Sequence, residues 1–455
     1  MKFHPHDLLL QEFAASFPED RAECLEHLIH CPDCRTRLRG LLHCRPSDPV
    51  ARVVPPERFQ DAPVNYDPGL DRISKTLQRV QSAYLRERTE APGLFFELSE
   101  HTIEKRPLLV RNCPRFHSWG LCELLLLRSE EQNFHNPHLG ESLALLALEV
   151  LERLDVSCYG AAAIEDLRAQ AWAYVANSRR LQADLRGAEE AFALAFAALK
   201  RGTFQPLVRA ELLDIKGSLL RAQRRFDKAL SLLHRAASIF LELGEKHQAG
   251  RVLVKMSTVH QSAGTPEKSI PVLYRALALI DPNREPRLLL GAWHNLADNL
   301  AESGRFMEAQ KLLAKARPLY RQFLDPWMQN RLKWVEGKVA RGLGQKEQAE
   351  ALLLAARNGF LAEGAAYDTA LVSLELAALY AEQNRSMAEL KRIAGEMLPI
   401  FSSLQIHREA LAALAFWKQA VEAERAGLDL VTGVASFLKR ARHDPELRFE
   451  RPAEP

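Results

Sequence analysis

Most of the chain shows the spacing of apolar and polar residues that is typical of amphipathic helices. Apolar positions recur every three to four residues among Ala, Leu, Glu, Arg and Gln, which favour helices. In the first part of the chain this pattern predicts helices at residues 71–88, 97–106, 117–130 and 140–154. Breaks are expected at Pro92-Gly93, Pro107 and Asn136-Pro137, because Pro and Gly interrupt helices. No strand pattern competes, so we expect an all-α protein.

From about residue 164 the predicted helices come in pairs that repeat about every 40 residues. A small residue opens the second helix of each pair, at Ala188, Ala229, Ser269, Ala309, Ala349 and Ala388. Small residues also stand seven places after and twelve places before the first five of these: Ala195, Ala236, Ala276, Ala316 and Ala356, and Ala176, Gly217, Ser257, Ala297 and Gly337. Such residues let helices cross closely and let each pair dock on the next. A regular period of this length predicts a solenoid.

These repeats resemble tetratricopeptide repeats. The family pattern is matched by Trp172, by Trp293 with Leu296, by Ala188 with Phe192, and by turn glycines at Gly264, Gly304 and Gly344. The resemblance covers roughly residues 160–400 and implies a right-handed helix-pair solenoid, with a degenerate pair near 117–155 and a capping pair near 408–442. The period near 40 departs from the 34 residues of this family, so a HEAT or armadillo solenoid remains the alternative.

A solenoid presents a concave surface, lined mainly by the first helix of each pair, to peptides and proteins. Counting from the small residues places seven side chains on first-helix positions that would face this groove: Asn177, Arg180, His294, Asp298, Trp334, Lys338 and Arg341. The alternative for each of them is ordinary surface. We therefore expect a protein or peptide partner in the groove.

A second, unlike region precedes the repeats. Residues 46–70 contain six prolines and few periodic apolar positions, which is typical of an extended linker. We expect five segments: a small domain at 1–45, the linker at 46–70, a helical segment at 71–160, the repeats at 161–405, and a helical cap and tail at 406–455.

The 1–45 segment contains a candidate metal site. His27, Cys31 and Cys34 form the pattern His-x3-Cys-x2-Cys. Residues i and i+4 share a helix face, and a turn at Pro32-Asp33 can bring Cys34 to the same point. Thiolates and imidazoles are the ligands that Zn²⁺ prefers, and a structural zinc site takes four of them.

This pattern resembles the zinc-binding domain of bacterial anti-sigma factors, over about residues 4–44. In that family a His or Cys ahead of the first helix supplies the fourth ligand, which implies His4 here, with His6 and Cys24 as alternatives. The resemblance implies a structural Zn²⁺ and a sigma factor as a partner of this domain. Release of the metal on thiol oxidation is a further possibility of the family, for which the spacing alone gives no support.

Composition narrows the function classes. The 455 residues carry 61 Lys plus Arg against 58 Asp plus Glu, a formal charge of +3, which gives no general reason to expect nucleic acid or a membrane as partner. Within residues 1–45, where acidic residues outnumber basic ones by seven to six, the stripe Arg35, Arg37 and Arg39 is a local basic exception. The longest apolar runs are too short to cross a bilayer, and the first residues lack a secretion signal, so we expect a cytoplasmic protein.

Searches for catalytic motifs give nothing: Gly-x-Ser-x-Gly, His-Glu-x2-His and Gly-x-Gly-x2-Gly are all missing from the sequence. We expect a non-enzymatic adaptor or regulator, with transcriptional control through the anti-sigma-like domain as the specific form. The first alternative is a scaffold whose zinc domain is purely structural. The second is an enzyme of unrecognised type within residues 71–160.

Overall fold

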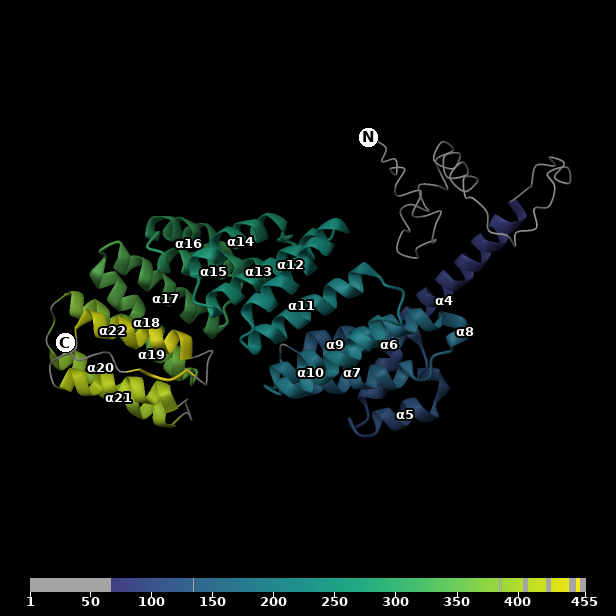
Figure 1. Ribbon diagram of the computed structural model, residues 1–455, viewed down its shortest axis with the longest axis horizontal. Helices are drawn as coiled ribbons and strands as arrows, with labels where there is room; N and C mark the ends of the chain where they lie inside the picture. Colours follow the sequence, from purple (N-terminus) through teal and green to yellow (C-terminus); the bar gives the residue numbers. More distant parts are fainter. Residues whose placement is uncertain are drawn as a thin grey trace, which may run out of the picture. The chain divides into compact units, whose positions relative to one another are not determined.

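The computed structural model describes residues 67–133, 135–383, 385, 387–403, 408–422, 427–441 and 447–450 (Figure 1). The chain divides into two compact units, Met1–Glu87 and Arg88–Pro455. Of the first unit, the structure describes the opening of helix α4 (Asp67–Ser99), and the other described helices belong to the second unit. The described residues form helices and turns without a strand, as the sequence predicts.

Four further helices precede the repeats, and a side chain caps the N-terminus of three of them. They are α5 (Arg106–Asn112), α6 (Trp119–Gln132), α7 (Pro137–Leu151) and the short α8 (Val156–Tyr159), with a 3-10 turn, η2, at Pro114–Phe116. The Ser118 hydroxyl accepts a hydrogen bond from the Leu121 amide, and the Asn136 side chain accepts one from the Leu139 amide. Each bond satisfies a helix amide that has no partner within the helix.

Helix α4 corrects two predictions. It continues through Pro92, where we expected a break, and it ends at Ser99, so that a turn replaces the helix predicted at 97–106. A proline inside a helix removes one backbone hydrogen bond. Ala91 and Leu98 are buried on either side of Pro92, and this packing offsets the loss.

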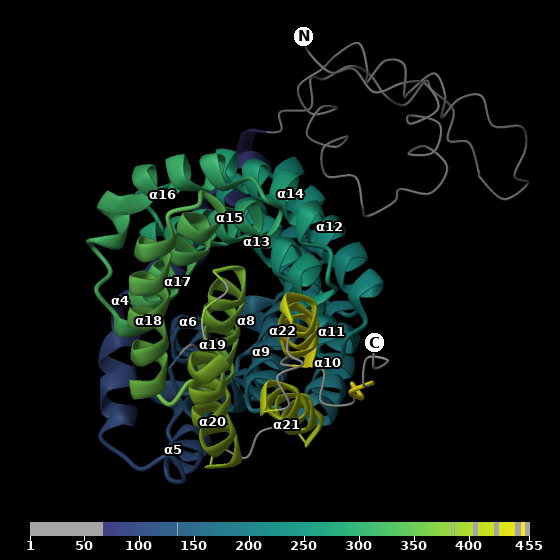
Figure 2. The ribbon, with the colours of Figure 1, turned by 90° about the vertical axis from the view of Figure 1, so that its left-hand side faces the viewer.

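The predicted helix pairs are present. In chain order they are α9 (Ala161–Leu181) with α10 (Leu185–Leu199), α11 (Pro206–Ala222) with α12 (Phe226–Glu242), α13 (Lys246–Ser262) with α14 (Pro266–Leu279), α15 (Pro286–Glu302) with α16 (Phe306–Tyr320), α17 (Pro326–Gly342) with α18 (Lys346–Ala362), α19 (Ala366–Glu382) with α20 (Met387–Ser403), and α21 (Arg408–Glu422) with α22 (Leu428–Ala441). Figure 2 shows the first helices α13 and α15 on the inner side of the curve and α12, α14 and α16 on the outer side.

The small residues pack where the helices cross. Ala188, Ala229, Ser269, Ala309 and Ala349 are all fully buried. A Cβ atom added to Gly217 would stand 2.6 Å from Cγ of Leu233, and one added to Gly337 would stand 2.8 Å from Cγ of Leu353. No side chain larger than hydrogen fits at these two crossings. The regular spacing of small residues therefore results from the close packing of the helices.

In the last repeat, the small residue predicted at the start of the second helix is wrong. Ala388 is exposed, whereas Leu390 is buried and takes the fourth helical position that Ala349 takes in α18. The second helix of this pair therefore packs through Leu390, Ile393 and Ala394. The predicted capping pair near 408–442 is present as α21 and α22, and α22 packs against α19 as well as α21.

Candidate partner-binding surface

Polar bonds link the first helices of successive pairs along the inner side of the repeats. Gln170 of α9 donates to Glu211 of α11 at 2.7 Å, and Lys255 of α13 pairs with Asp214 of α11 at 2.6 Å. Lys338 of α17 pairs with Asp298 of α15 at 2.8 Å. We call these side chains, together with the other polar side chains of the first helices and of α6 and α22 that lie along the same side, the inner ladder.

In the C-terminal part of the inner ladder, the charged side chains form ion pairs with one another. Lys338 lies 2.6 Å from Glu302 in addition to Asp298, and its side chain is only 9% exposed. Burial alone would lower the pKa of Lys338, but the carboxylates of Asp298 and Glu302 outweigh it and raise the pKa above its usual value. The ammonium group is therefore fixed between α15 and α17.

Helix α22 adds a contact from far along the chain. Lys439 of α22 donates to both carboxylate oxygens of Glu302 of α15, at 2.8 and 2.9 Å, and lies 3.8 Å from Glu375 of α19. Burial would raise the pKa of Glu302, whereas Lys338 and Lys439 lower it to well below its usual range. In Figure 2, α22 lies on the inner side of the curve, beside α19. The C-terminal helix thus occupies the last part of the inner surface.

The N-terminal part of the inner ladder carries a carboxylate with a shifted pKa. Burial raises the pKa of Glu211 to about 7, and the nearby charges of Glu130 and Asp214 add to the effect against the hydrogen bond from Gln170. Arg251 of α13 lies 3.7 Å from Glu130 of α6. Side chains of α6, α9, α11 and α13 therefore meet in one polar region.

Two arginines stand beside this region, on adjacent first helices. Arg180 of α9 donates two hydrogen bonds to the Asn177 amide oxygen, at 3.1 and 2.8 Å. Burial lowers the pKa of Arg180 to about 10, with a further contribution from the charge of Arg221 on α11, and burial lowers the pKa of Arg221 as well. Within the described part of the chain, neither guanidinium has an ion pair.

The structure distributes the seven predicted groove residues unevenly. Asn177 with Arg180, and Asp298 with Lys338, form two bonded pairs on the inner ladder. Arg341 lies there too, where it donates to Glu375 and Glu382 of α19 at 2.7 and 2.6 Å.

The other two predicted groove residues, His294 and Trp334, differ from the prediction because they are buried, at 1% and 9% exposure. His294 bonds to the Tyr320 hydroxyl at 2.8 Å, and Trp334 packs edge-on against Phe360. Both side chains point towards the second helix of their own pair and pack beneath the inner surface.

Other residues of the inner ladder were missed at the sequence level. Glu302, Glu375 and Lys439 give no motif, because their partners lie in other repeats. Arg221 had a usable signal: it stands four residues after a small anchor, Gly217, as Arg180 stands four after Ala176.

The predicted zinc ligands are His27, Cys31, Cys34 and His4, with His6 and Cys24 as alternatives for the fourth, and all of them lie outside the described residues. Among the residues that the structure describes, no three metal-ligating side chains come together.

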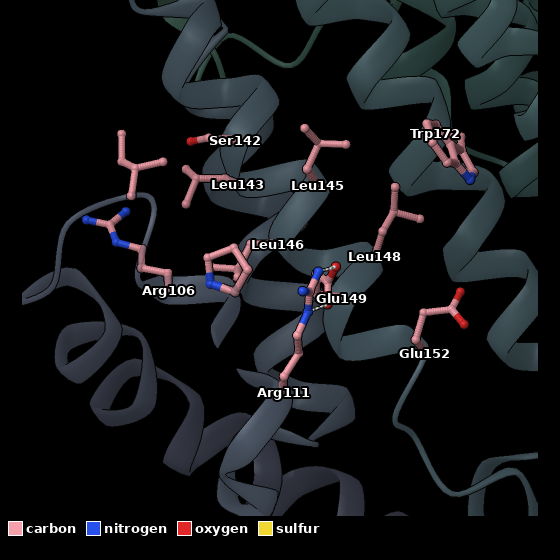
Figure 3. Close-up of a pocket in the computed structure, with 12 residues that line it drawn as sticks. Arg106, Arg111, Ser142, Leu143, Leu145, Leu146, Leu148, Glu149, Glu152 and Trp172 are labelled. Atoms are coloured by element: carbon pink, nitrogen blue, oxygen red, sulfur yellow. Dashed lines mark hydrogen bonds and ion pairs between the residues drawn. The ribbon is translucent and has the colours of Figure 1, made fainter. Parts of the chain in front are cut away.

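A pocket of about 500 Å³ lies between α5 and α7 and reaches Trp172 of α9 (Figure 3). Its wall is largely leucine side chains of α7, including Leu145 and Leu148. Arg111 crosses it and donates to both Glu149 oxygens, at 2.9 and 2.5 Å, so that the pKa of Glu149 is lowered, mainly by this hydrogen bond. Arg111 and Glu149 are therefore engaged with each other. Of the other charged residues at this pocket, Arg106 donates to the backbone oxygens of His101 and Ser99, and Glu152 pairs with Arg168.

These features define a class: a helical-repeat protein of tetratricopeptide-like fold with a polar inner surface. No protein-family model matches the chain, and no curated protein matches it. Among solved structures, the chain is similar to a Rap protein crystallised in complex with competence and sporulation factor. The two share 14% sequence identity with a TM-score of 0.51, over 71% of this chain and 87% of the other. At this identity the similarity shows the fold.

None of the described helices has the length and apolar character that a membrane crossing requires.

Proposed function

We propose that this chain is a cytoplasmic adaptor or regulator that binds a protein or peptide segment on its inner surface, without catalytic turnover. The observation that carries the proposal is the inner ladder, in which polar side chains are presented by the first helices of successive pairs. The similar Rap protein was crystallised with a bound factor, which supports a binding role for this fold.

The section formed by α9, α11 and α13 is the binding region that we propose. In the C-terminal section, Lys338, Arg341 and Lys439 are all neutralised by carboxylates of the chain itself, and α22 packs there. In the N-terminal section, no carboxylate among the described residues forms an ion pair with Arg180 or Arg221, and burial raises the pKa of Glu211. A partner gains most where polar groups are not already satisfied.

Photo-cross-linking on the full chain tests this proposal. A benzoylphenylalanine at Ser218, one residue after Gly217 on α11, should capture a partner from cells, whereas the same group at Arg186 on the outer helix α10 should not. The Arg186 side chain is 93% exposed, so non-specific capture would be seen most readily at this control position. Equal capture at both positions, or capture only at Arg186, would contradict binding at the inner surface.

For the N-terminal residues we propose a structural Zn²⁺ held by His27, Cys31, Cys34 and His4, and contact with a sigma factor. The support is the ligand spacing, since four such ligands fill a structural zinc site. The double variant Cys31→Ser/Cys34→Ser should lose about one zinc per chain by elemental analysis. Retention of zinc in this variant would remove the metal site.

Pull-down of a sigma factor by the full chain separates the regulator from the scaffold whose zinc domain is purely structural. The third alternative, an enzyme in residues 71–160, gains no support from the pocket there, because Arg111 and Glu149 neutralise each other.

A further inference from the structure

We propose that a pocket at the turns of two successive helix pairs binds a nucleoside diphosphate or triphosphate through its phosphate groups. The pocket has a volume of about 520 Å³ and lies where α11 turns into α12 and α13 turns into α14. This volume is within the range of sites that hold small molecules. The site goes beyond the proposed function, because it lies at the turns of the repeats and not on the inner ladder.

The charged lining of this pocket is mainly basic. It includes one carboxylate, Asp227, and four cationic side chains: Arg224, Arg225, Lys228 and Lys268. Arg225, Lys228 and Lys268 are exposed, and no carboxylate in the described part of the chain forms an ion pair with any of these three. Glu189 of α10 lies near enough to interact with the charge of Arg225, but two other side chains already donate hydrogen bonds to it. The pocket therefore carries an excess of positive charge.

The next helix pair shows the same turn with its charges paired. Arg305 precedes α16 as Arg225 precedes α12. Glu308 takes the helix position that Lys228 and Lys268 take in α12 and α14. Arg305 donates to both carboxylate oxygens of Glu308, at 2.7 and 2.6 Å. In the turn before α12 a lysine replaces this carboxylate, so two like charges stand at a helix N-terminus, which favours negative charge.

The backbone of the first turn places a further cation at the pocket wall. Arg224 has a φ of 60°, a conformation that Ala183 takes in the preceding turn and that glycine takes in the three following turns, at Gly264, Gly304 and Gly344. An L residue is disfavoured in this conformation, and such strain is concentrated at functional sites. The Arg224 guanidinium lies 5.5 Å from the centroid of the Phe226 ring. This cation–π contact fixes its charge beside the pocket.

The lining favours several phosphates carried on an organic group. A carboxylate has one negative charge and a phosphate monoester has at most about two, whereas the cations here come from two successive turns. Burial lowers the pKa of His260, and the charge of Lys268 lowers it further, so the positive charge of the cluster acts across the pocket. The apolar part of the lining, against which a sugar or base can pack, is formed by Phe226, Leu230 and Ala263.

Isothermal titration calorimetry on the full chain tests this site, with ADP, GDP, ATP and GTP as probes. At least one of these nucleotides should bind at one site per chain, and its monophosphate should bind at least about tenfold more weakly, since fewer phosphate oxygens reach the cations. Lys228→Gln and Lys268→Gln should each weaken binding about five- to tenfold, because each removes a charged hydrogen bond. The matched control Arg305→Gln removes an equal charge at the equivalent turn and should bind with wild-type affinity.

Several results would contradict the site. Absence of nucleotide binding, or wild-type affinity in both lysine variants, would overturn it. An equal loss of affinity in Arg305→Gln would mean that the nucleotide is attracted to surface charge in general, and the site would again be wrong. Tighter binding of a single-stranded oligonucleotide than of any nucleotide would exclude a small molecule as the ligand. None of these results bears on capture of a partner at position 218, which tests the proposed function separately.

Discussion

At the scale of single residues, the inner surface is a set of charges that differ in how well they are paired. Lys338 and Arg341 are each held by two carboxylates of neighbouring helices. Arg180 and Arg221 occupy comparable positions, and no carboxylate in the described part of the chain forms an ion pair with either of them. A charge that loses water and gains no partner lowers the stability of the folded state.

The stability of two methionine variants should therefore change in opposite directions. Arg221→Met should raise the free energy of unfolding by on the order of 1 kcal/mol, because it removes an unpaired, partly buried charge. Arg341→Met should lower the free energy of unfolding by about 1–3 kcal/mol, because it leaves Glu375 and Glu382 without their partner. Urea unfolding at neutral pH measures both. Destabilisation of similar size in both variants would show that Arg221 is structural.

The ionisation of Glu211 should make stability depend on pH. Its pKa in the folded protein is raised to about 7 from an ordinary 4.5, so the folded state holds this proton more tightly than the unfolded state. Stability should fall as pH rises from 4.5 to 7, and above pH 7 the full cost, on the order of 3 kcal/mol, applies.

Glu211→Gln should therefore be more stable than the wild type at pH 8, and the difference should shrink towards pH 5. Urea unfolding at the two pH values measures it. Glu308→Gln, at an exposed site on α16, is the control and should show little of this trend. A wild-type advantage at pH 8 would mean that the charged form of Glu211 is stabilised by its neighbours.

At the scale of helices, the sequence predicts which residues pack at helix crossings better than it predicts which side chains are exposed. The fixed phases of small residues identified five crossings correctly, because close approach of two helices leaves no freedom in residue size. The same rule placed Ala388 wrongly, because Leu390 takes that role in the last pair. His294 and Trp334 were expected on the surface, since counting positions cannot show that they turn towards the second helix.

Two glycine variants test the crossing geometry. Gly217→Ala should lower the free energy of unfolding by about 1–3 kcal/mol, since its Cβ would overlap Leu233. Gly291→Ala, inside the first helix α15 with nothing within 4 Å of the new Cβ, should raise the free energy of unfolding by about 0.5–1 kcal/mol through helix propensity. If Gly217→Ala also stabilises the protein, the assigned crossing between α11 and α12 is wrong.

At the scale of the whole chain, the repeats place residues far apart in sequence on one surface. Lys439 and Glu302 are separated by 137 residues and share two hydrogen bonds. No local pattern reveals such a contact, which depends on the curvature that the helix pairs from α15 to α22 accumulate. The polar region in which side chains of α6, α9, α11 and α13 meet could not be predicted, for the same reason.

The contact of α22 with the inner surface should depend on Lys439. Lys439→Gln should speed amide hydrogen exchange in α22 by about two- to fivefold, because the pair with Glu302 is partly exposed and of modest strength. Arg440→Gln, at the exposed neighbouring residue, should leave exchange unchanged. Identical exchange in both variants would show that apolar packing alone holds α22 in place.

Hydrogen exchange of the full chain, measured with and without the partner captured at position 218, tests the central claim most directly. Binding at the inner surface predicts slower exchange in α9, α11 and α13, with little change in α10, α12 and α14 of the same pairs. Protection confined to α10, α12 and α14, or no protection in α9, α11 and α13, would contradict binding at the inner surface.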